Sequence, residues 1–346
     1  MMNITPSKVR CHFPLKSLNT FGVKAYASNF VLIRDVAYLQ ELLSNYVREE
    51  VAVLVLGGGS NILFTQDFQG LVIKNEITGK EIIEENDSWV KVKVGGGEVW
   101  HDFVLYSIEQ GWGGIENLSL IPGTVGAAPI QNIGAYGVEL KDVFVELEAI
   151  DIHTGELKKF TKQECQFDYR NSIFKQELKG AFVITSVTFL LTKNTHQYNI
   201  SYGAISKTLE AAGIVELSPK VISDAVIEIR SSKLPDPEEI GNCGSFFKNP
   251  VIDAKHFGEI EAKYPSIPSY PTANPGKIKV PAGWLIEQCG WKGKQVGNVG
   301  TYHKQALVLV NLGNATGLEA KALAMDIQQS VKEQFGIALQ PEVNIL

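Results

Sequence analysis

One stretch with almost no charge decides how this chain folds: Ile121-Pro122-Gly123-Thr124-Val125-Gly126-Ala127-Ala128-Pro129-Ile130-Gln131-Asn132-Ile133-Gly134-Ala135-Tyr136-Gly137. A solvent-exposed linker of this length would be more polar. Small apolar residues let a backbone press against a flat ligand such as an isoalloxazine ring. Gln131 and Asn132 offer amide groups to the edge of such a ring. We interpret the stretch as a ligand-binding loop, with a purely structural loop as the alternative.

A shorter glycine-rich loop precedes it, in Val53-Leu54-Val55-Leu56-Gly57-Gly58-Gly59-Ser60-Asn61. A strand that leads into glycines suggests a dinucleotide fingerprint, but the third spaced glycine is missing and residues 62–67 do not open a helix. No Gly-Lys-Ser/Thr follows, which excludes a Walker A loop. The remaining interpretation is a nest of backbone N–H groups around a phosphate, with Ser60 and Asn61 as further donors. A plain turn is the alternative.

A third motif lies in the last third of the chain: Gly241-Asn242-Cys243-Gly244-Ser245-Phe246-Phe247-Lys248-Asn249-Pro250. Gly244 allows the backbone to approach a bound group. Ser245 offers a proton, and Lys248 and Asn249 offer donors to a polar or anionic ligand. The structural alternative is a turn that runs into a buried Phe-Phe strand.

Bulk composition excludes several classes of function. The chain has 346 residues and a net charge of −6, so a broad basic face for nucleic acid is not expected. Its four cysteines form no CxxC pair, and its six histidines have no paired spacing, so we expect no metal site and no disulfide framework. Residues 1–10 lack an apolar core, and no run approaches a membrane span of about 18 residues. We expect a cytoplasmic protein without membrane contact.

Hydrophobic patterning predicts mixed strands and helices. We expect strands at 51–56, 89–94 and 182–191, a helix at 99–110, and a hairpin that pairs 143–152 with 157–161. Residues 196–232 are predicted to be helical, with Ser218-Pro219 opening a second helix before Lys233-Leu234-Pro235-Asp236-Pro237 ends it. A last helix is predicted from the capping box of Thr316 and Glu319 to Gly336. Extended segments are expected at 337–339 and 343–346.

Five or more motifs in order resemble the UDP-N-acetylenolpyruvoylglucosamine reductase (MurB) family, from about Leu15 to Glu342. They are the three stretches above, Asp168-Tyr169-Arg170-Asn171-Ser172-Ile173-Phe174-Lys175, Asn19-Thr20-Phe21-Gly22-Val23, Pro281-Ala282-Gly283-Trp284-Leu285-Ile286 and Pro341-Glu342-Val343. Ser201-Tyr202-Gly203 is similar to the tyrosine segment of the family's longer members. The resemblance implies an α+β fold, with an FAD-binding region of the vanillyl-alcohol-oxidase (PCMH) type in two subdomains and a C-terminal α+β substrate domain. The implied boundaries are 1–70, 71–232 with the tyrosine segment around 196–215, and 233–346.

The resemblance also implies a reaction. NADPH gives a hydride to FAD, the hydride passes to C3 of the enolpyruvyl ether, and C2 is protonated to give UDP-N-acetylmuramate. Ser245 is implied as the proton donor, and Arg170 and Glu342 as groups that stabilise the enolic intermediate. The chemistry fits, because Arg170 is always cationic and bidentate toward a developing carboxylate charge. Each residue taken alone also has a structural interpretation. Ser245 could cap an element, Arg170 could form a surface ion pair, and Glu342 could be a charge at the rim of the site.

Further site residues come from the same resemblance. FAD, held without a covalent bond, is implied to contact Gly57, Gly58, Gly59, Ser60, Asn61, Gly123, Thr124, Gly126, Ala127, Gln131, Asn132, Gly134, Ala135, Tyr136 and Arg170. The UDP-sugar is implied to contact Tyr169, Tyr202, Lys233, Asn249, Tyr270, Lys292 and Gln305. One departure is visible: family members often carry Arg two residues after the final Glu, where this chain has Asn344. We expect a monomer, and no metal, nucleic acid or membrane.

Two other classes of protein remain open. An FAD oxidase of the same cofactor fold, acting on a sugar or alcohol, often tethers its flavin to His or Cys, and neither glycine-rich loop contains one. A non-catalytic nucleotide-sugar binder would not need Ser245, Arg170 and Glu342 together. NADPH oxidation that depends on the enolpyruvyl substrate would separate the reductase from both.

Overall fold

This computed structural model describes residues 9–46, 51–272 and 274–346. Most of the N-terminal segment judged above to lack an apolar core, residues 1–8, lies outside the described residues. The α-helices are α1 (Val36–Tyr46), α2 (Trp100–Glu109), α3 (Gly203–Ala211), α4 (Pro219–Lys233), α5 (Ala254–Glu261), α6 (Ala282–Gln288) and α7 (Gly317–Phe335). Short 3₁₀ helices are η2 (Lys16–Leu18), η3 (Glu116–Leu118), η4 (Ala128–Gln131), η5 (Leu140–Asp142) and η6 (Ile173–Lys175). Among the described residues, no helix has both the length and the apolar character needed to cross a membrane.

The chain forms two compact units. The first contains residues 1–13, 27–58 and 68–232, as far as they are described, and the second contains 14–26, 59–67 and 233–346. The α+β fold class is confirmed, because both units mix helices and strands. The three-part division at 70 and 232 stays a prediction.

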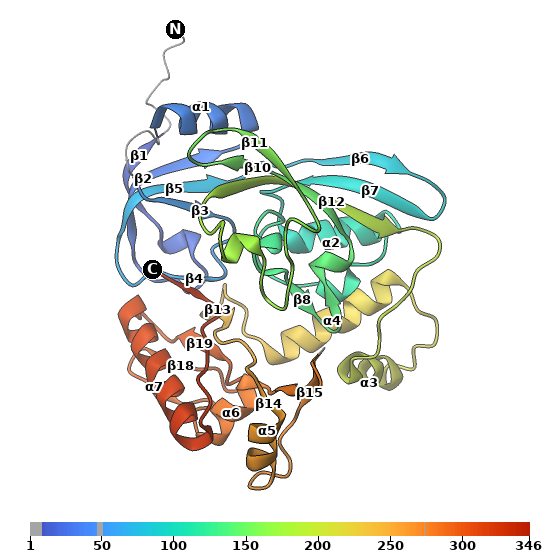
Figure 1. The fold of residues 1–346 in the computed structure, drawn as a ribbon, viewed down its shortest axis with the longest axis vertical. Coiled ribbons are helices and arrows are strands. Elements are labelled where there is room, and N and C mark those ends of the chain that lie inside the picture. The colour runs from blue at the N-terminus through green and yellow to red at the C-terminus, as the bar shows by residue number, and fades with distance from the viewer. Residues whose placement is uncertain (1–8, 47–50, 273) are drawn as a thin grey trace. The chain divides into compact units, whose positions relative to one another are not determined.

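The first unit has a four-stranded sheet covered by α1 (Figure 1). Its order is β1 (Arg10–Pro14), β2 (Tyr26–Ile33), β5 (Phe68–Asn75) and β3 (Val53–Leu56), and β5 runs parallel to β2 and β3. Leu71 and Ile73 of β5 pack with Leu39 and Leu43 of α1. The strand predicted at 51–56 begins only at Val53, and only Leu56 is buried. It is half-buried rather than fully buried because β3 is an edge strand.

A five-stranded antiparallel sheet forms the rest of the core of the first unit, with α2 beside it (Figure 1). Its order is β11 (Leu157–Thr161), β10 (Phe144–Asp151), β12 (Phe182–Thr192), β7 (Trp89–Gly95) and β6 (Lys80–Glu85). The predicted hairpin, the strands at 89–94 and 182–191, and the helix at 99–110 are confirmed. A small hairpin pairs β8 (Gly134–Ala135), in the second glycine-rich loop, with β9 (Val138–Glu139), which follows the loop directly.

The helical prediction for 196–232 is wrong in its first seven residues. Helices α3 and α4 cover 203–211 and 219–233, whereas 196–202 is non-helical. The side chain of Asn199 accepts from both the backbone N–H and the hydroxyl of Ser201, and such local bonds compete with a helix. The start of α4 is confirmed, since Ser218 Oγ accepts from the N–H of Val221 at 3.2 Å and Pro219 is the first helical residue.

The second unit is built on a four-stranded sheet of β13 (Gly241–Ser245), β19 (Val308–Asn311), β18 (Val299–Thr301) and β17 (Gln295–Val296). Helix α7 is confirmed with its capping box, and Gly336 ends it at a φ of +68°. A three-stranded sheet has the order β14 (Val251–Asp253), β16 (Lys277–Lys279) and β15 (Tyr270–Pro271). A separate two-stranded sheet pairs β20 (Asn344–Ile345) with β4 (Ile62–Leu63). The extended segment predicted at 337–339 forms no strand.

Candidate active site

The two predicted glycine-rich loops lie against each other in the first unit. A Cβ atom on Gly57 would lie 2.6 Å from Thr124 Oγ1, and one on Gly58 would lie 2.9 Å from the Cα of Gly123. Contacts this close leave no room for a side chain, so glycine is required by packing. The structure therefore joins parts of the chain 66 residues apart in sequence (57 to 123) into one continuous backbone surface.

The first loop then turns at Gly59, which belongs to the second unit. Its φ is +67°, and a Cβ atom would lie 1.9 Å from the carbonyl oxygen of Leu18. The Gly59 carbonyl accepts from the N–H of Thr20 at 3.1 Å. The half-buried Ser60 follows, and Asn61 donates to the carbonyl of Glu342 at 3.3 Å. The motif at 19–23 thus supports the turn of this loop.

The second loop is pressed against the sheet of the first unit. A Cβ atom on Gly126 would lie 2.9 Å from the carbonyl oxygens of Gly96 and Ile184. Gln131 accepts from Lys175 Nζ at 3.2 Å, and Ala127 and Ala135 are half-buried.

Asn132 differs from what the sequence suggested. Its fully buried side chain donates to Glu139 and to the carbonyl of Asp168, and accepts from the N–H of Lys141. These bonds use both amide protons and the oxygen, which argues against a contact of this amide with the edge of a ring. Asn132 holds the shape of the loop instead.

Arg170 lies at the tip of a two-residue turn closed by reciprocal backbone hydrogen bonds between Asp168 and Asn171. Its φ of +50° is a strained value for a residue with a side chain. Its guanidinium donates to the carbonyl of Gly134, and Ser172 Oγ donates to the carbonyl of Ile130 at 2.7 Å. The turn is therefore fixed to the second loop, and the guanidinium also lies 5.3 Å from the ring centre of Tyr169.

Sequence reasoning missed Arg230. It is carried by α4 and donates to the hydroxyl of Tyr136, while its buried Nε has no hydrogen-bond partner in the described part of the chain. Burial lowers the pKa of Arg230 and raises the pKa of Tyr136, against the opposing influence of Arg230 on the tyrosine. The sequence feature that could have indicated a buried arginine is its position in α4, directly after the periodic apolar residues Ile222, Val226 and Ile229.

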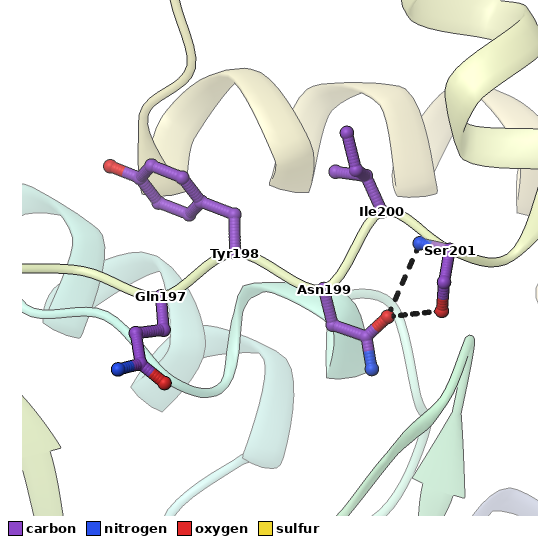
Figure 2. Close-up of a pocket in the computed structure, with 5 residues that line it drawn as sticks. All are labelled: Gln197, Tyr198, Asn199, Ile200 and Ser201. Atoms are coloured by element: carbon purple, nitrogen blue, oxygen red, sulfur yellow. Dashed lines mark hydrogen bonds between the residues drawn. The ribbon is translucent and has the colours of Figure 1, made fainter.

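Tyr202 is the residue before the first turn of α3, and its ring packs edge-to-face on Tyr136 with centres 5.2 Å apart. The segment before it is tied to the second loop. Asn117 donates to the carbonyls of both Tyr136 and Asn199, and Asn199 donates to the carbonyl of Gly137. Figure 2 shows the pocket that residues 197–201 line, with the bonds between Asn199 and Ser201. Gly203 is the first residue of α3, so the helix begins directly after Tyr202.

Ser245 and Glu342 are brought together in the second unit. Residues 246–248 pair with 340–342 through two backbone hydrogen bonds: Phe246 accepts from Glu342, and Lys248 donates to Gln340. Phe247 thus lies opposite Pro341. Ser245 ends β13, and its exposed hydroxyl makes no hydrogen bond within the described residues. The next two residues, Phe246 and Phe247, are buried. Gly244 has a φ of +68°, and Cys243 is a packed thiol whose pKa is raised to about 12 by burial.

Three of the predicted substrate contacts gather around α6. Asn249 Oδ1 accepts from the N–H of Ala282 at 2.9 Å, a Cβ atom on Gly283 would lie 2.8 Å from Gln305 Oε1, and Lys292 forms an ion pair with Glu287 at 2.9 Å. The carboxylate partly neutralises Lys292, which weakens it as a cation for a diphosphate. Lys233 is exposed at the end of α4, and Tyr270 is exposed with Lys279 5.8 Å from its ring centre. At position 344, Asn344 donates to the carbonyl of Asn61.

These residues suit a flavin nucleotide. Gly58, Gly123 and Thr124 donate their backbone N–H groups to no acceptor in the described structure, and such groups on a glycine surface bind phosphate. The neighbouring second loop offers small residues, and Arg230 offers an unpartnered buried N–H. Among the described residues, no group of three or more His, Cys, Asp or Glu is arranged to hold a metal ion. The fold and the site define an FAD-binding protein of the α+β class.

Comparison with known proteins agrees with this class. A family model described as FAD binding domain matches residues 27–161, and one described as UDP-N-acetylenolpyruvoylglucosamine reductase, C-terminal domain, matches residues 236–346. UDP-N-acetylenolpyruvoylglucosamine reductase of Flavobacterium johnsoniae is 50% identical over 98% of this chain and 100% of its own length. The same enzyme of Amoebophilus asiaticus is 52% identical over 97% of this chain and 98% of its own length. The chain therefore belongs to the UDP-N-acetylenolpyruvoylglucosamine reductase family.

A solved structure shows the same fold. The crystal structure of UDP-N-acetylenolpyruvylglucosamine reductase (MurB) from Thermus caldophilus matches with a TM-score of 0.65 at 22% identity, and the match covers 98% of each chain.

Proposed function

We propose that this chain reduces UDP-N-acetylglucosamine enolpyruvate to UDP-N-acetylmuramate in peptidoglycan synthesis. Family membership over almost the whole chain supports the proposal. The observation that carries it is the backbone pairing of 246–248 with 340–342, because it brings the segment of Glu342 next to that of Ser245, whose exposed hydroxyl makes no hydrogen bond within the described residues.

FAD, when bound, supplies to C3 of the enolpyruvyl group the hydride that it takes from NADPH. Ser245 donates the proton to C2. Serine is a weak acid in water, so it serves only toward a strong base held beside it, and a carbanion-like C2 is such a base. Arg170 and Glu342 stabilise the enolic intermediate at the carboxylate of the substrate. The fixed turn of Arg170 supports this role, because electrostatic stabilisation depends on charges that need not reorganise.

Binding is assigned to the remaining predicted residues. The two glycine-rich loops hold FAD without a covalent bond, and Tyr169, Tyr202, Lys233, Asn249, Tyr270, Lys292 and Gln305 contact the UDP-sugar. The grouping of Asn249, Gln305 and Lys292 around α6 supports a shared surface for the nucleotide. We further propose that NADPH is the co-substrate and that the protein is a cytoplasmic monomer. Its four cysteines are free, which fits a reducing compartment.

The proposal is tested with purified protein. The protein is expected to be yellow, and acid precipitation is expected to release FAD into the supernatant. NADPH oxidation is expected to require UDP-N-acetylglucosamine enolpyruvate and to form UDP-N-acetylmuramate. If the protein instead consumes oxygen with an alcohol or sugar, and NADPH oxidation does not depend on the enolpyruvyl substrate, an oxidase is favoured. A colourless protein would contradict the cofactor assignment.

A further inference from the structure

Lys74 is a lysine without a carboxylate partner, in the sheet behind the first glycine-rich loop. It lies on β5 directly opposite Leu56, the last residue of β3. Its neighbours Leu71 and Ile73 face α1, so the alternation of a strand turns Lys74 to the other face of the sheet. There its ammonium donates to the carbonyl of Gly57 at 2.6 Å.

The charge of Lys74 is not neutralised within the described part of the chain. Its one hydrogen bond there is to a backbone carbonyl, and no Asp or Glu lies within ion-pair distance. Glu76, the acidic group nearest in sequence, pairs with Arg34 at 3.3 Å. Lys74 is half-buried, and burial lowers its pKa while Glu76 acts in the opposite direction. Buried charges are normally paired. The ammonium of Lys74 is directed to the Gly57 carbonyl and not to a carboxylate, so its charge is available to an anion that the polypeptide itself does not supply.

The bond from Lys74 also orients the loop. In a trans peptide the carbonyl of one residue and the N–H of the next point in opposite directions. Because the Gly57 carbonyl points to Lys74, the N–H of Gly58 points away from it. This N–H donates to no acceptor in the described structure. The lysine thereby sets the direction of a phosphate-binding N–H group and adds a positive charge behind it.

We propose that Lys74 is the positioning residue and counter-charge for the diphosphate of FAD, acting through the Gly57–Gly58 peptide. The inference rests on the proposed function only in taking FAD as the ligand. A residue with this role discriminates between flavins: it strengthens the binding of FAD, which carries the diphosphate, and contributes little to riboflavin, which has none.

The test compares Lys74→Met, Lys74→Gln and Lys91→Met as apoproteins. Lys91 pairs with Glu84 at the surface of the same unit, so its loss changes the net charge equally. Kd values for FAD and riboflavin are measured by quenching of flavin fluorescence at two salt concentrations. Lys74→Met is expected to raise the Kd for FAD by about tenfold, the scale of one charged contact, and to leave the Kd for riboflavin within about twofold. Its FAD affinity is also expected to depend less on salt.

The other outcomes are distinct. Lys74→Gln keeps a donor without the charge, so a full loss with this variant assigns the effect to charge and a partial loss assigns part of it to loop orientation. Equal losses for FAD and riboflavin, or an unchanged Kd for FAD, would overturn the inference. If the unmodified protein binds no FAD at all, the proposed function fails first, whatever the variants do.

Discussion

The backbone N–H of Glu342 donates to the carbonyl oxygen of Phe246 at 2.8 Å. This bond places the carboxylate residue one position from Ser245 across a two-stranded pairing, although the two lie 97 residues apart (245 to 342). The buried side chains of Phe246 and Phe247 anchor this segment in the core of the second unit. Backbone pairing therefore holds the segments of these two residues next to each other.

Ser245→Ala is expected to slow reduction of the enolpyruvyl substrate by about 10²–10⁴-fold, the usual cost of losing a general acid. Hydride transfer from NADPH to bound FAD is expected to stay near its original rate, because the hydroxyl serves only the second half of the reaction. Stopped-flow absorbance of the flavin measures the two half-reactions separately.

The melting temperature serves as the control for Ser245→Ala. Because the exposed hydroxyl makes no hydrogen bond within the described residues, its removal is expected to leave stability unchanged. Equal losses of rate in both half-reactions would make Ser245 a structural residue. Partial recovery of the rate in Ser245→Cys would strengthen the assignment as acid.

Tyr202→Phe is expected to raise KM for the UDP-sugar and to spare kcat. The hydroxyl is assigned one hydrogen bond to a charged phosphate, worth about 1.5–3 kcal/mol at most, which corresponds to a rise of roughly 10–100-fold in KM. The ring of Phe keeps the packing on Tyr136, so the segment is expected to stay in place. Steady-state kinetics with variable substrate provide the measurement.

Asn117→Ala is the matched comparison for Tyr202→Phe. It removes the amide that joins the carbonyls of Tyr136 and Asn199 and leaves the tyrosine intact. It is expected to raise KM as well, through loss of the segment's position. A large fall in kcat for Tyr202→Phe at saturating substrate would move this tyrosine from binding to chemistry.

Much of this site was predictable because, at many positions, the residue type that the structure requires can be recognised from the local sequence. Gly58 and Gly126 are glycines because neighbouring backbone leaves no room for a Cβ atom, and at Gly57 the side chain of Thr124 occupies that space. A cluster of such positions is visible in sequence. The α7 capping box and the Ser218-Pro219 helix start are equally local. Ser245, Arg170 and Glu342 were found through the order of motifs, and their catalytic roles stay predictions.

What the sequence did not reveal depends on partners that lie far away along the chain. The amide of Asn132 is occupied by Glu139, Asp168 and Lys141, and the ammonium of Lys292 by Glu287. No local pattern shows that a polar side chain is already bonded. Lys74 and Arg230 were missed for the opposite reason, since each lies among apolar residues of a strand or helix. Only the packed structure shows that the charge of Lys74 has no carboxylate partner and that the Nε–H of Arg230 has no acceptor in the described part of the chain.

Stability is expected to fall as the pH drops below about 6.5, the ordinary pKa of histidine, in part through His101. Burial lowers the pKa of His101, Arg230 lowers it further, and Asp102 opposes both. Between the two pKa values the unfolded chain binds more protons than the folded one, so the free energy of unfolding rises with pH in this window. Its Nδ1 accepts from the N–H of Leu120 at 3.0 Å, which also favours the neutral ring.

His101→Asn tests this dependence, since the Asn oxygen replaces the Nδ1 acceptor and does not titrate. The melting temperature of His101→Asn is expected to vary less between pH 7.5 and 5 than that of the unmodified protein. His153→Asn, at an exposed position, is the control. If His153→Asn flattens the profile as much as His101→Asn does, the pH dependence does not come from the half-buried ring of His101.

Gly59→Ala is expected to prevent folding of the second unit. Gly290→Ala is the comparison that separates the cost of the backbone conformation from the cost of a steric overlap. Both glycines have left-handed backbones, with φ values of +67° and +73°, so alanine costs each about 1–2 kcal/mol through its conformation. Around Gly290 there is open space, whereas a Cβ atom on Gly59 would lie 1.9 Å from the Leu18 carbonyl, which cannot move without breaking the turn that Thr20 holds. Thermal melts followed by circular dichroism are expected to show a modest loss for Gly290→Ala and no cooperative transition, or no soluble protein, for Gly59→Ala. Similar melts for the two variants would mean that the loop relaxes away from Leu18, and that close packing does not require glycine at this position.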